Sequence, residues 1–293
     1  MRLPGTAAQL IMTALTDIQS EHDSRGVPIE EVGITGLRYP VTFDDGTLKQ
    51  ATTADIELTV ALPARQRGTH MSRMVQLVDT HLQTVSPHEL PRVMKTAGAL
   101  LDADKIFLRM AMPLATRMSA PTSGEQGFQV HDIALDAKWG VDPFTLKTSA
   151  TVDVTTLCPC SKAISDYGAH NQRSRVTLSV HGYGDAVYPA GVPQMVKLIQ
   201  GSASCPVYPV VKRPDERTIT MAAYDNPRFV EDLVRELSLS CRDRGLPHSI
   251  TARNIESIHS HDAVARLSWD PVGDCLWLTG SLNRAEFRIR VRD

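Results

Sequence analysis

Two segments of the sequence carry the residue types that hold metals and move protons. In the first, the run Cys158-Pro159-Cys160 is followed, twelve residues after its first cysteine, by His170. A cysteine and a histidine at this separation can converge on one metal ion across a loop, although Cys-x-Cys is not a specific zinc spacing. Buried structural thiols are an equally good interpretation of the pair, because free cysteine is among the most buried residue types.

The second segment covers residues 254–262 and contains Glu256, His259 and His261. On a strand, Ser257 and both histidines would share one face. Histidine titrates near neutral pH, so two histidines beside carboxylates have the makings of acid and base catalysis. The alternative interpretation is an exposed strand end.

Two further segments offer weaker signals. Residues 67–73 form a glycine-containing loop that enters a helix, where backbone N–H groups with His70, Ser72 and Arg73 could hold a phosphate. This loop lacks the spacing of a P-loop, and ordinary helix capping is the alternative. The charged run over residues 212–217 is typical of a solvated turn.

The elements that must position these residues follow an order that occurs twice. In the first half, the hydrophobic pattern predicts strands over 29–40, 53–62, 105–114 and 128–139, and helices over 71–83 and 86–103. In the second half it predicts strands over 144–157, 175–181, 249–258 and 263–269, helices over 192–200 and from 227 onward, and further extended segments over 275–282 and 285–291. Antiparallel strands segregated from helices favour an α+β fold built from two modules.

Local signals set the expected ends of some of these elements. Asp44-Asp45-Gly46 predicts a hairpin turn. Ser86 with Glu89 predicts a capping box. Asn226 followed by a proline predicts the start of another helix, with Glu231 on its polar face, where most glutamates are exposed.

Composition limits the class of protein. The chain has 293 residues, which allows about two domains. A formal net charge of -2 excludes a globally basic nucleic-acid-binding protein, and no apolar run approaches the roughly 18 residues that a membrane span needs. Five cysteines, an odd number, favour reduced thiols and a cytoplasmic location over a disulfide-linked secreted protein.

Taken together, five ordered motifs resemble the prokaryotic type IB GTP cyclohydrolases I. The motifs are Gly68-Thr69-His70-Met71-Ser72-Arg73, Cys158-Pro159-Cys160-Ser161-Lys162, Gly168-Ala169-His170-Asn171-Gln172-Arg173, Lys212-Arg213-Pro214-Asp215-Glu216 and Asn254-Ile255-Glu256-Ser257-Ile258-His259-Ser260-His261. The resemblance implies the tunnelling fold, with two ββαα(ββ)-type modules per chain. We expect these modules over residues 28–140 and 141–293.

The resemblance implies that GTP and water are converted to 7,8-dihydroneopterin triphosphate and formate, the first step of tetrahydrofolate biosynthesis. It makes Cys158, His170 and Glu216 the ligands of a divalent metal, with Cys160 close enough to support or replace a ligand. Three protein ligands leave a fourth position for water, as in catalytic zinc sites. Zinc suits this set best, and manganese and iron stay open.

The resemblance also assigns the groups that touch the nucleotide. Glu231 would accept two hydrogen bonds from the guanine ring N–H and the exocyclic amine. The groups that transfer protons would be Glu256, His259 and His261. The triphosphate would be held from a neighbouring subunit by His70, Ser72 and Arg73.

The resemblance also implies a homotetramer with active sites at subunit interfaces, and we expect this assembly for the present protein. Two alternatives remain. An archaeal-like relative would give a cyclic phosphate product, and a non-catalytic binding module would use the metal for stability only. The related nitrile reductases of queuosine synthesis require a Glu-Ser-Lys-Ser-type motif that the sequence lacks.

Overall fold

The computed structural model describes residues 17–140 and 143–271. The strands are β1 (Ile29–Asp44), β2 (Lys49–Leu62), β3 (Thr84–Val85), β4 (Ile106–Ser119), β5 (Gln126–Trp139), β6 (Thr145–Leu157), β7 (Asn171–Tyr183), β8 (Cys205–Pro206), β9 (His248–Ile255) and β10 (Ala263–Trp269). The helices are α2 (Met71–His81), α3 (Leu90–Leu101), α4 (Pro159–Ile164), α5 (Val192–Gly201), α6 (Arg213–Asp225) and α7 (Val230–Arg242), with short 3-10 turns η1 (Ile18–Ser20) and η2 (Pro87–Glu89).

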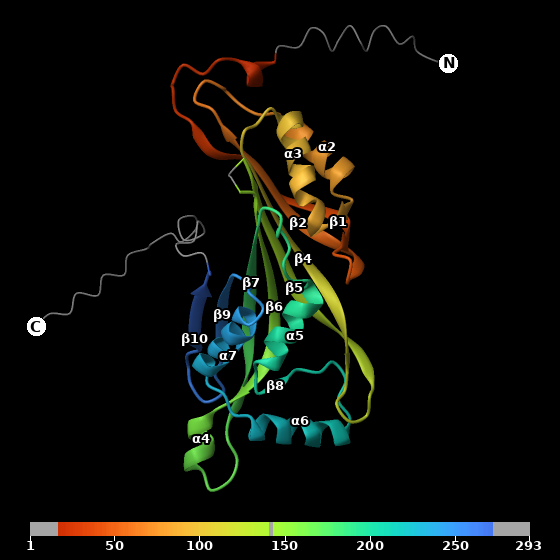
Figure 1. Ribbon diagram of the computed structural model, residues 1–293, viewed down its shortest axis with the longest axis vertical. Helices are drawn as coiled ribbons and strands as arrows, with labels where there is room; N and C mark the ends of the chain where they lie inside the picture. The colour runs from red at the N-terminus through yellow and green to blue at the C-terminus, as the bar shows by residue number, and fades with distance from the viewer. Residues whose placement is uncertain (1–16, 141–142, 272–293) are drawn as a thin grey trace, which may run out of the picture.

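One sheet runs through the described part of the chain, in the order β10-β9-β7-β6-β5-β4-β2-β1-β3, with β8 paired to β6. Its long strands are antiparallel to their neighbours. Helices α2 and α3 lie beside the strands of the first half, and α5 and α7 beside those of the second (Figure 1). The α+β class and the repeated order of two strands, helices and two strands are therefore confirmed. The boundary between residues 140 and 141 stays a prediction.

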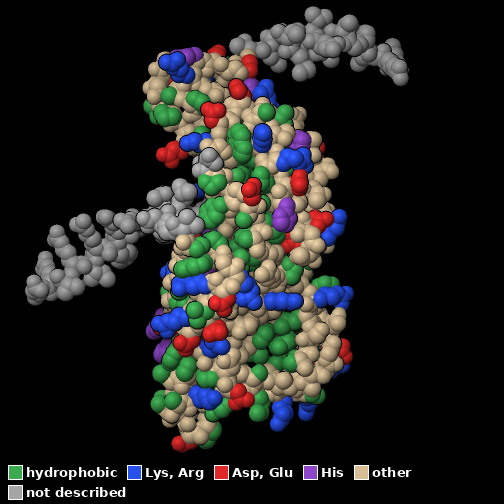
Figure 2. Space-filling model, viewed as in Figure 1, with side chains coloured by type: hydrophobic (Ala, Val, Ile, Leu, Met, Phe, Trp, Pro, Cys, Tyr) green, Lys and Arg blue, Asp and Glu red, His purple; other side chains and the backbone are tan. Residues whose placement is uncertain are grey.

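Alternation along the strands builds the core, as predicted. On β2, Ile56, Leu58 and Val60 are each 1% exposed. On α2, Met74, Leu77 and Val78 are buried, while Met71 and Val75 are exposed. Charged side chains of both signs are interspersed over the face seen in Figure 2, in keeping with the small net charge.

The structure corrects two predicted helix starts. Ser86 precedes the turn η2 but makes no side-chain capping bond, so the predicted capping box is wrong. Asn226 ends α6 instead of starting the next helix. Its side-chain amide donates to the backbone carbonyl of Ala203 at 3.0 Å, and α7 begins four residues later, where Asp232 accepts from the N–H of Phe229.

Two helices lie where the sequence analysis predicted none. The charged run over 212–217 is the first turn of α6, with proline near its start and two acidic residues in its first turn. Both are ordinary helix-start signals, outweighed in the prediction by the charge of the run. The short helix α4 follows Cys158. The extended segments predicted over 275–282 and 285–291 lie outside the described residues, and no helix within the described ranges is long and apolar enough to cross a membrane.

A buried aspartate joins the two halves of the chain. Asp45, in the predicted hairpin turn, is 4% exposed and accepts hydrogen bonds from Thr47 and the N–H of Leu48 in its own turn. Its other oxygen accepts from the Tyr188 hydroxyl at 2.8 Å and the N–H of Val192 at the start of α5. Burial alone would raise the pKa of this carboxyl. The hydrogen bonds lower the pKa by more than burial raises it, so the net pKa lies below its ordinary value.

Asp45→Ala is expected to lower the free energy of unfolding by roughly 2–4 kcal/mol, because it strands several buried donors at once. The matched control is Asp44→Ala, which removes a partly exposed carboxylate paired with Lys49 at 3.0 Å and should cost less than about 1 kcal/mol. Urea unfolding of both variants measures the difference. Equal losses would show that Asp45 does not fasten the two halves.

Candidate active site

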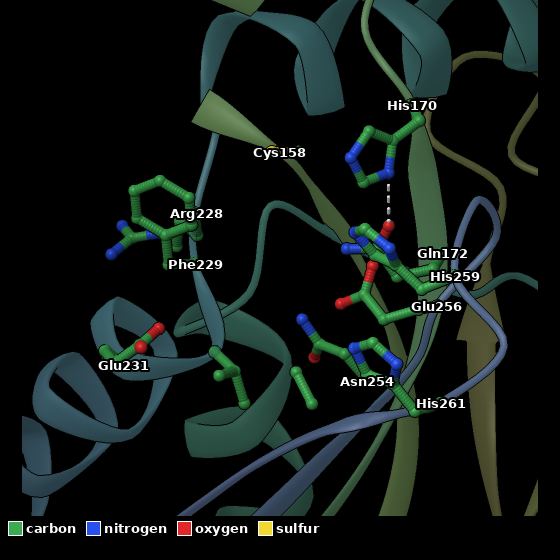
Figure 3. A pocket seen from close by; sticks show the side chains of 12 residues that line it. Cys158, His170, Gln172, Arg228, Phe229, Glu231, Asn254, Glu256, His259 and His261 are labelled. Atoms are coloured by element: carbon green, nitrogen blue, oxygen red, sulfur yellow. Dashed lines mark hydrogen bonds between the residues drawn. The ribbon is translucent and has the colours of Figure 1, made fainter. Parts of the chain in front are cut away.

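An open pocket of about 270 Å³ lies in the second half of the chain, and most of the predicted chemistry meets there (Figure 3). The predicted site residues that line it are Cys158, His170, Glu231, Glu256, His259 and His261. The lining residues that the sequence analysis did not single out are Gln172, Arg228, Phe229, Val230, Asn254 and Ala263. The pocket thus collects groups from β7, α7, the end of β9 and the loops that follow β6 and β9.

Strand pairing explains why Cys158 and His170 converge. Strands β6 and β7 pair from Leu157 opposite Asn171, so the next residues outward are Cys158 and His170. The Cys158 N–H donates to the His170 carbonyl at 3.1 Å. The intervening loop folds into α4, whose Ser161 accepts from the His170 N–H at 3.0 Å and donates its own N–H to the Cys158 sulfur at 3.4 Å. Cys158 and His170 therefore lie next to each other across the loop, and their shared binding of a metal stays a prediction.

A hydrogen bond orients the imidazole of His170. Its Nδ1 lies 3.0 Å from Oε1 of Gln172, whose amide nitrogen donates to Thr156 at 2.9 Å. In the arrangement with the Gln172 oxygen facing the ring, Nδ1 would carry the proton and Nε2 would keep a lone pair. Metal-binding histidines are commonly held in this way, by a partner on the other ring nitrogen.

The residues predicted to transfer protons lie in a loop and not on a strand. Strand β9 ends at Ile255, and β9–β10 pairing begins with Asn254 opposite Ala263, which leaves residues 256–262 outside the sheet. The predicted strand over 249–258 is therefore too long. The rings of His259 and His261 stack with centroids 5.1 Å apart, and Glu256 lines the same pocket.

The start of α7 forms the opposite wall. Glu231 lies in its first turn and lines the pocket. The backbone N–H of Arg228 donates to the Leu157 carbonyl at 3.0 Å, which ties the start of this helix to the end of β6. The guanidinium of Arg228 is 3.5 Å from Glu236, and its buried Nε has no hydrogen-bond partner within the described residues.

Glu216 and Cys160 do not line this pocket. Glu216 is exposed on α6, in a surface depression with Arg213 and Arg217. The far end of α6 meets α4, since Lys162 donates to the Tyr224 carbonyl at 2.5 Å, and helical rise puts Glu216 about 12 Å back along the helix from Tyr224. The described residues hold no cluster of three His, Cys, Asp or Glu side chains suited to a metal ion.

The predicted triphosphate residues also lie elsewhere. His70 and Arg73 line a pocket of about 90 Å³ at the start of α2, where the His70 Nε2 is 3.3 Å from the Asp17 carboxylate. Ser72 is exposed on the same helix. Helices α2 and α4 lie toward opposite ends of the long axis in Figure 1. One chain therefore does not bring these residues to Cys158.

A buried aspartate next to Glu216 anchors α6. Asp215 is fully buried and accepts from the N–H groups of Thr122 and Ser123, the Ser123 hydroxyl and the N–H of Lys212. These bonds fasten α6 to the loop between β4 and β5. Burial raises the pKa of this carboxyl, but the hydrogen bonds from Ser123, Lys212 and Thr122 outweigh it and hold the pKa well below its ordinary 3.8.

A depressed folded-state pKa gives stability that is present above the unfolded-state pKa and is lost as pH falls through the folded value. The melting temperature of the wild-type protein is therefore expected to fall steeply below about pH 4. Asp215→Asn should start lower at pH 7 and decline less on acidification, whereas Asp225→Asn, at the exposed end of α6, should follow wild type. Thermal melts from pH 2 to 7 test this, and parallel curves for wild type and Asp215→Asn would contradict it.

Comparison with known proteins identifies the family. A family model described as Type I GTP cyclohydrolase folE2 matches residues 15–265, which is most of the chain. The chain belongs to the FolE2 family. All five motifs noted in the sequence fall within the matched residues.

Similar FolE2 proteins match over nearly their whole length. The GTP cyclohydrolase FolE2 of Neisseria gonorrhoeae is 38% identical over 260 residues, covering 88% of this chain and 100% of the relative. That of Bordetella avium is 42% identical over 256 residues, covering 86% and 95%. Among solved structures, urate oxidase from Bacillus subtilis aligns with a TM-score of 0.46 and 10% identity, covering 83% of this chain and 99% of that one.

Sequence reasoning missed several pocket residues of this FolE2 chain for different reasons. Gln172 and Asn254 lie inside motifs that were recognised, and their alternation with predicted site residues was the available signal. Arg228 carried no signal of its own, because its place depends on the backbone bond that joins α7 to β6.

Proposed function

We propose that the pocket beneath α7 is where this GTP cyclohydrolase opens the guanine ring of GTP to give 7,8-dihydroneopterin triphosphate and formate, the first step of folate biosynthesis. The observation that carries the proposal is the meeting of Cys158 and His170 with an acid–base cluster and with Glu231 in one pocket. The reaction needs ligands for a metal that activates water, groups that transfer protons and a group that recognises guanine. Thiolate, imidazole and carboxylate side chains can fill these roles.

Cys158 and His170 fit a divalent metal by their chemistry and placement. The sulfur and Nε2 both belong to residues that line the pocket, and the contact of Gln172 with Nδ1 leaves Nε2 for the metal. When bound, the metal supplies a water nucleophile at neutral pH. Zinc suits thiolate and imidazole ligands best, with manganese and iron as the alternatives. Cys160, exposed on α4, would support or replace a ligand.

The remaining pocket residues bind the nucleotide and move protons. Glu231 accepts two hydrogen bonds from the N–H edge of guanine, which fixes the base in the pocket. Ring opening and release of formate require proton transfers, and Glu256, His259 and His261 stand within the pocket to make them.

The residues that lie outside the pocket point to sites completed by neighbouring copies. Glu216 is exposed on α6, and the triphosphate group of His70, Ser72 and Arg73 lies toward the other end of the molecule. In a homotetramer with interfacial sites, a second copy would supply Glu216 or the triphosphate cradle. This arrangement makes the active site dependent on assembly.

The test is turnover of GTP by purified protein loaded separately with zinc, manganese or iron, followed by formate release and pterin fluorescence. Formate with a pterin triphosphate supports the proposal. A cyclic phosphate product would favour the archaeal-like alternative. No turnover with any of the three metals would favour the metal-stabilised binding module.

Glu216→Ala provides a separate test of the third ligand. We expect it to lose both bound metal and activity, and a mixed assembly with a Cys158→Ala chain should regain some activity if the two residues come from different copies. Full metal content and activity in Glu216→Ala would remove this residue from the ligand set.

A further inference from the structure

A chain of buried polar side chains runs beneath the pocket from His170 to Asn254. Gln172 contacts His170 Nδ1 at 3.0 Å and Thr156 at 2.9 Å, Thr156 contacts Ser174 at 2.8 Å, and Ser174 contacts the Asn254 Oδ1 at 2.6 Å. The four residues beyond the histidine are each at most 7% exposed. The chain crosses β7, β6, β7 again and β9, so its two ends meet the pocket at different places.

This series of hydrogen bonds has a direction, because each hydroxyl in it has one proton to donate. Thr156 accepts from the Gln172 amide, so its proton goes to Ser174, and the Ser174 proton goes to Asn254 Oδ1. Reversing the direction requires turning both amides over and moving the imidazole proton from Nδ1 to Nε2. The heavy-atom positions admit these two arrangements, and the tautomer of His170 selects between them.

A metal at His170 selects one direction. Nδ1 is occupied by Gln172, so only Nε2 can bind a metal, and it must be unprotonated to do so. Nδ1 then donates, and every later bond is fixed in turn. At the far end, Asn254 Oδ1 is held by Ser174, which leaves the Nδ2 amide without a hydrogen bond among the described residues and among the side chains of the pocket (Figure 3).

We propose that Asn254 is a substrate-contacting residue, whose Nδ2 donates to the carbonyl oxygen of a 6-oxopurine base, and that the buried chain holds it as a donor when His170 binds metal. This inference rests on the proposed function. Once Glu231 takes the N–H edge of the base, the neighbouring carbonyl needs a donor. Adenine carries an amino group there, so the same donor would reject it. Gln172, Thr156 and Ser174 are positioning residues.

The first test replaces Asn254 by aspartate, which keeps an acceptor for Ser174 and removes the donor. The ligand is 7-deaza-GTP, in which carbon replaces N7, so C8 is no longer an amidine carbon and cannot be hydrolysed. We expect metal content to be unchanged and the dissociation constant to rise roughly ten- to hundredfold, as for a lost hydrogen bond that leaves a polar group unpaired. An analogue without the base oxygen should bind wild type and Asn254→Asp equally.

The second test breaks the chain with Thr156→Val. Metal affinity, measured by chelator competition, should fall roughly tenfold or more, as for loss of an outer hydrogen-bond partner, and 7-deaza-GTP affinity should fall with it. The matched control is Thr151→Val on the same strand, which removes a cross-strand hydroxyl pair with Thr177 at 2.8 Å outside the chain and should change neither. Ser174→Ala breaks the chain at another point if Thr156→Val does not fold.

The outcomes separate this inference from the proposed function. Turnover of GTP by wild type, with unchanged 7-deaza-GTP binding in Asn254→Asp, would overturn the role of Asn254 and leave the function standing. Equal loss for the analogue without the oxygen would overturn the assigned contact. Thr156→Val behaving like Thr151→Val would overturn the link to the metal. Absence of turnover in wild type would instead contradict the proposed function.

Discussion

Cys158→Ser is expected to release the metal and to lower kcat/KM for GTP by more than about a hundredfold, a larger loss than outer partners of metal ligands cause. Serine is a poor ligand for zinc compared with a thiolate. It is, however, a preferred residue at a helix N-cap, the position that Cys158 occupies before α4. The substitution therefore removes the sulfur while the N–H of Ser161 keeps an acceptor.

The design separates metal binding from folding. Metal content by elemental analysis and melting temperature should diverge in Cys158→Ser, with metal lost and the apo fold retained. Cys160→Ser, two residues further along the chain and exposed on α4, serves as the matched control and should keep most metal and activity. If Cys160→Ser lost the metal and Cys158→Ser retained it, the ligand assignment within this motif would be reversed.

Much of the fold could be predicted because its signals are local. Alternation along β2 places Ile56 and Leu58 in the core, and the same pattern marks most of the sheet strands. Helix α6 was missed although its start signals are present, because its surface is polar and its anchor is Asp215, which bonds to a loop about 90 residues earlier in the chain. A contact of that range leaves no periodic trace in the sequence.

The candidate site, too, contains residues that the sequence could predict and residues that it could not. Cys158 and His170 could be paired from sequence because they lie at the adjoining ends of two paired strands that a short loop connects. The histidine loop was placed on a strand, since the sequence shows its alternation but not the register at which β9 and β10 stop pairing. Glu216 came from resemblance alone, and His70 from a weak loop signal together with the resemblance. A single chain brings neither residue to the pocket. Residues that act across copies carry no spacing rule within one sequence.

Glu231→Gln is expected to raise the dissociation constant for GTP by more than about a hundredfold while sparing the metal, because two hydrogen bonds to a charged group are worth roughly 1.5–3 kcal/mol each. Glutamine keeps the size of the side chain but presents an N–H to a base edge that also donates. Equilibrium binding of 7-deaza-GTP measures the loss without turnover. Glu89→Gln, which removes an exposed carboxylate paired with Arg92 in the first half of the chain, is the control and should bind as wild type does.

The inosine analogue sharpens this prediction, because it lacks the exocyclic amine and can give Glu231 only one hydrogen bond. Wild type should discriminate between the 7-deaza forms of GTP and inosine triphosphate by roughly tenfold or more, the value of one such bond. Glu231→Gln should discriminate far less, since the group that reads the amine is gone. A double-mutant cycle over protein and ligand gives the coupling directly. Undiminished discrimination in the variant would show that another residue recognises the guanine edge. Glu231 would then be only an acidic residue in the first turn of α7, without a role in binding the base.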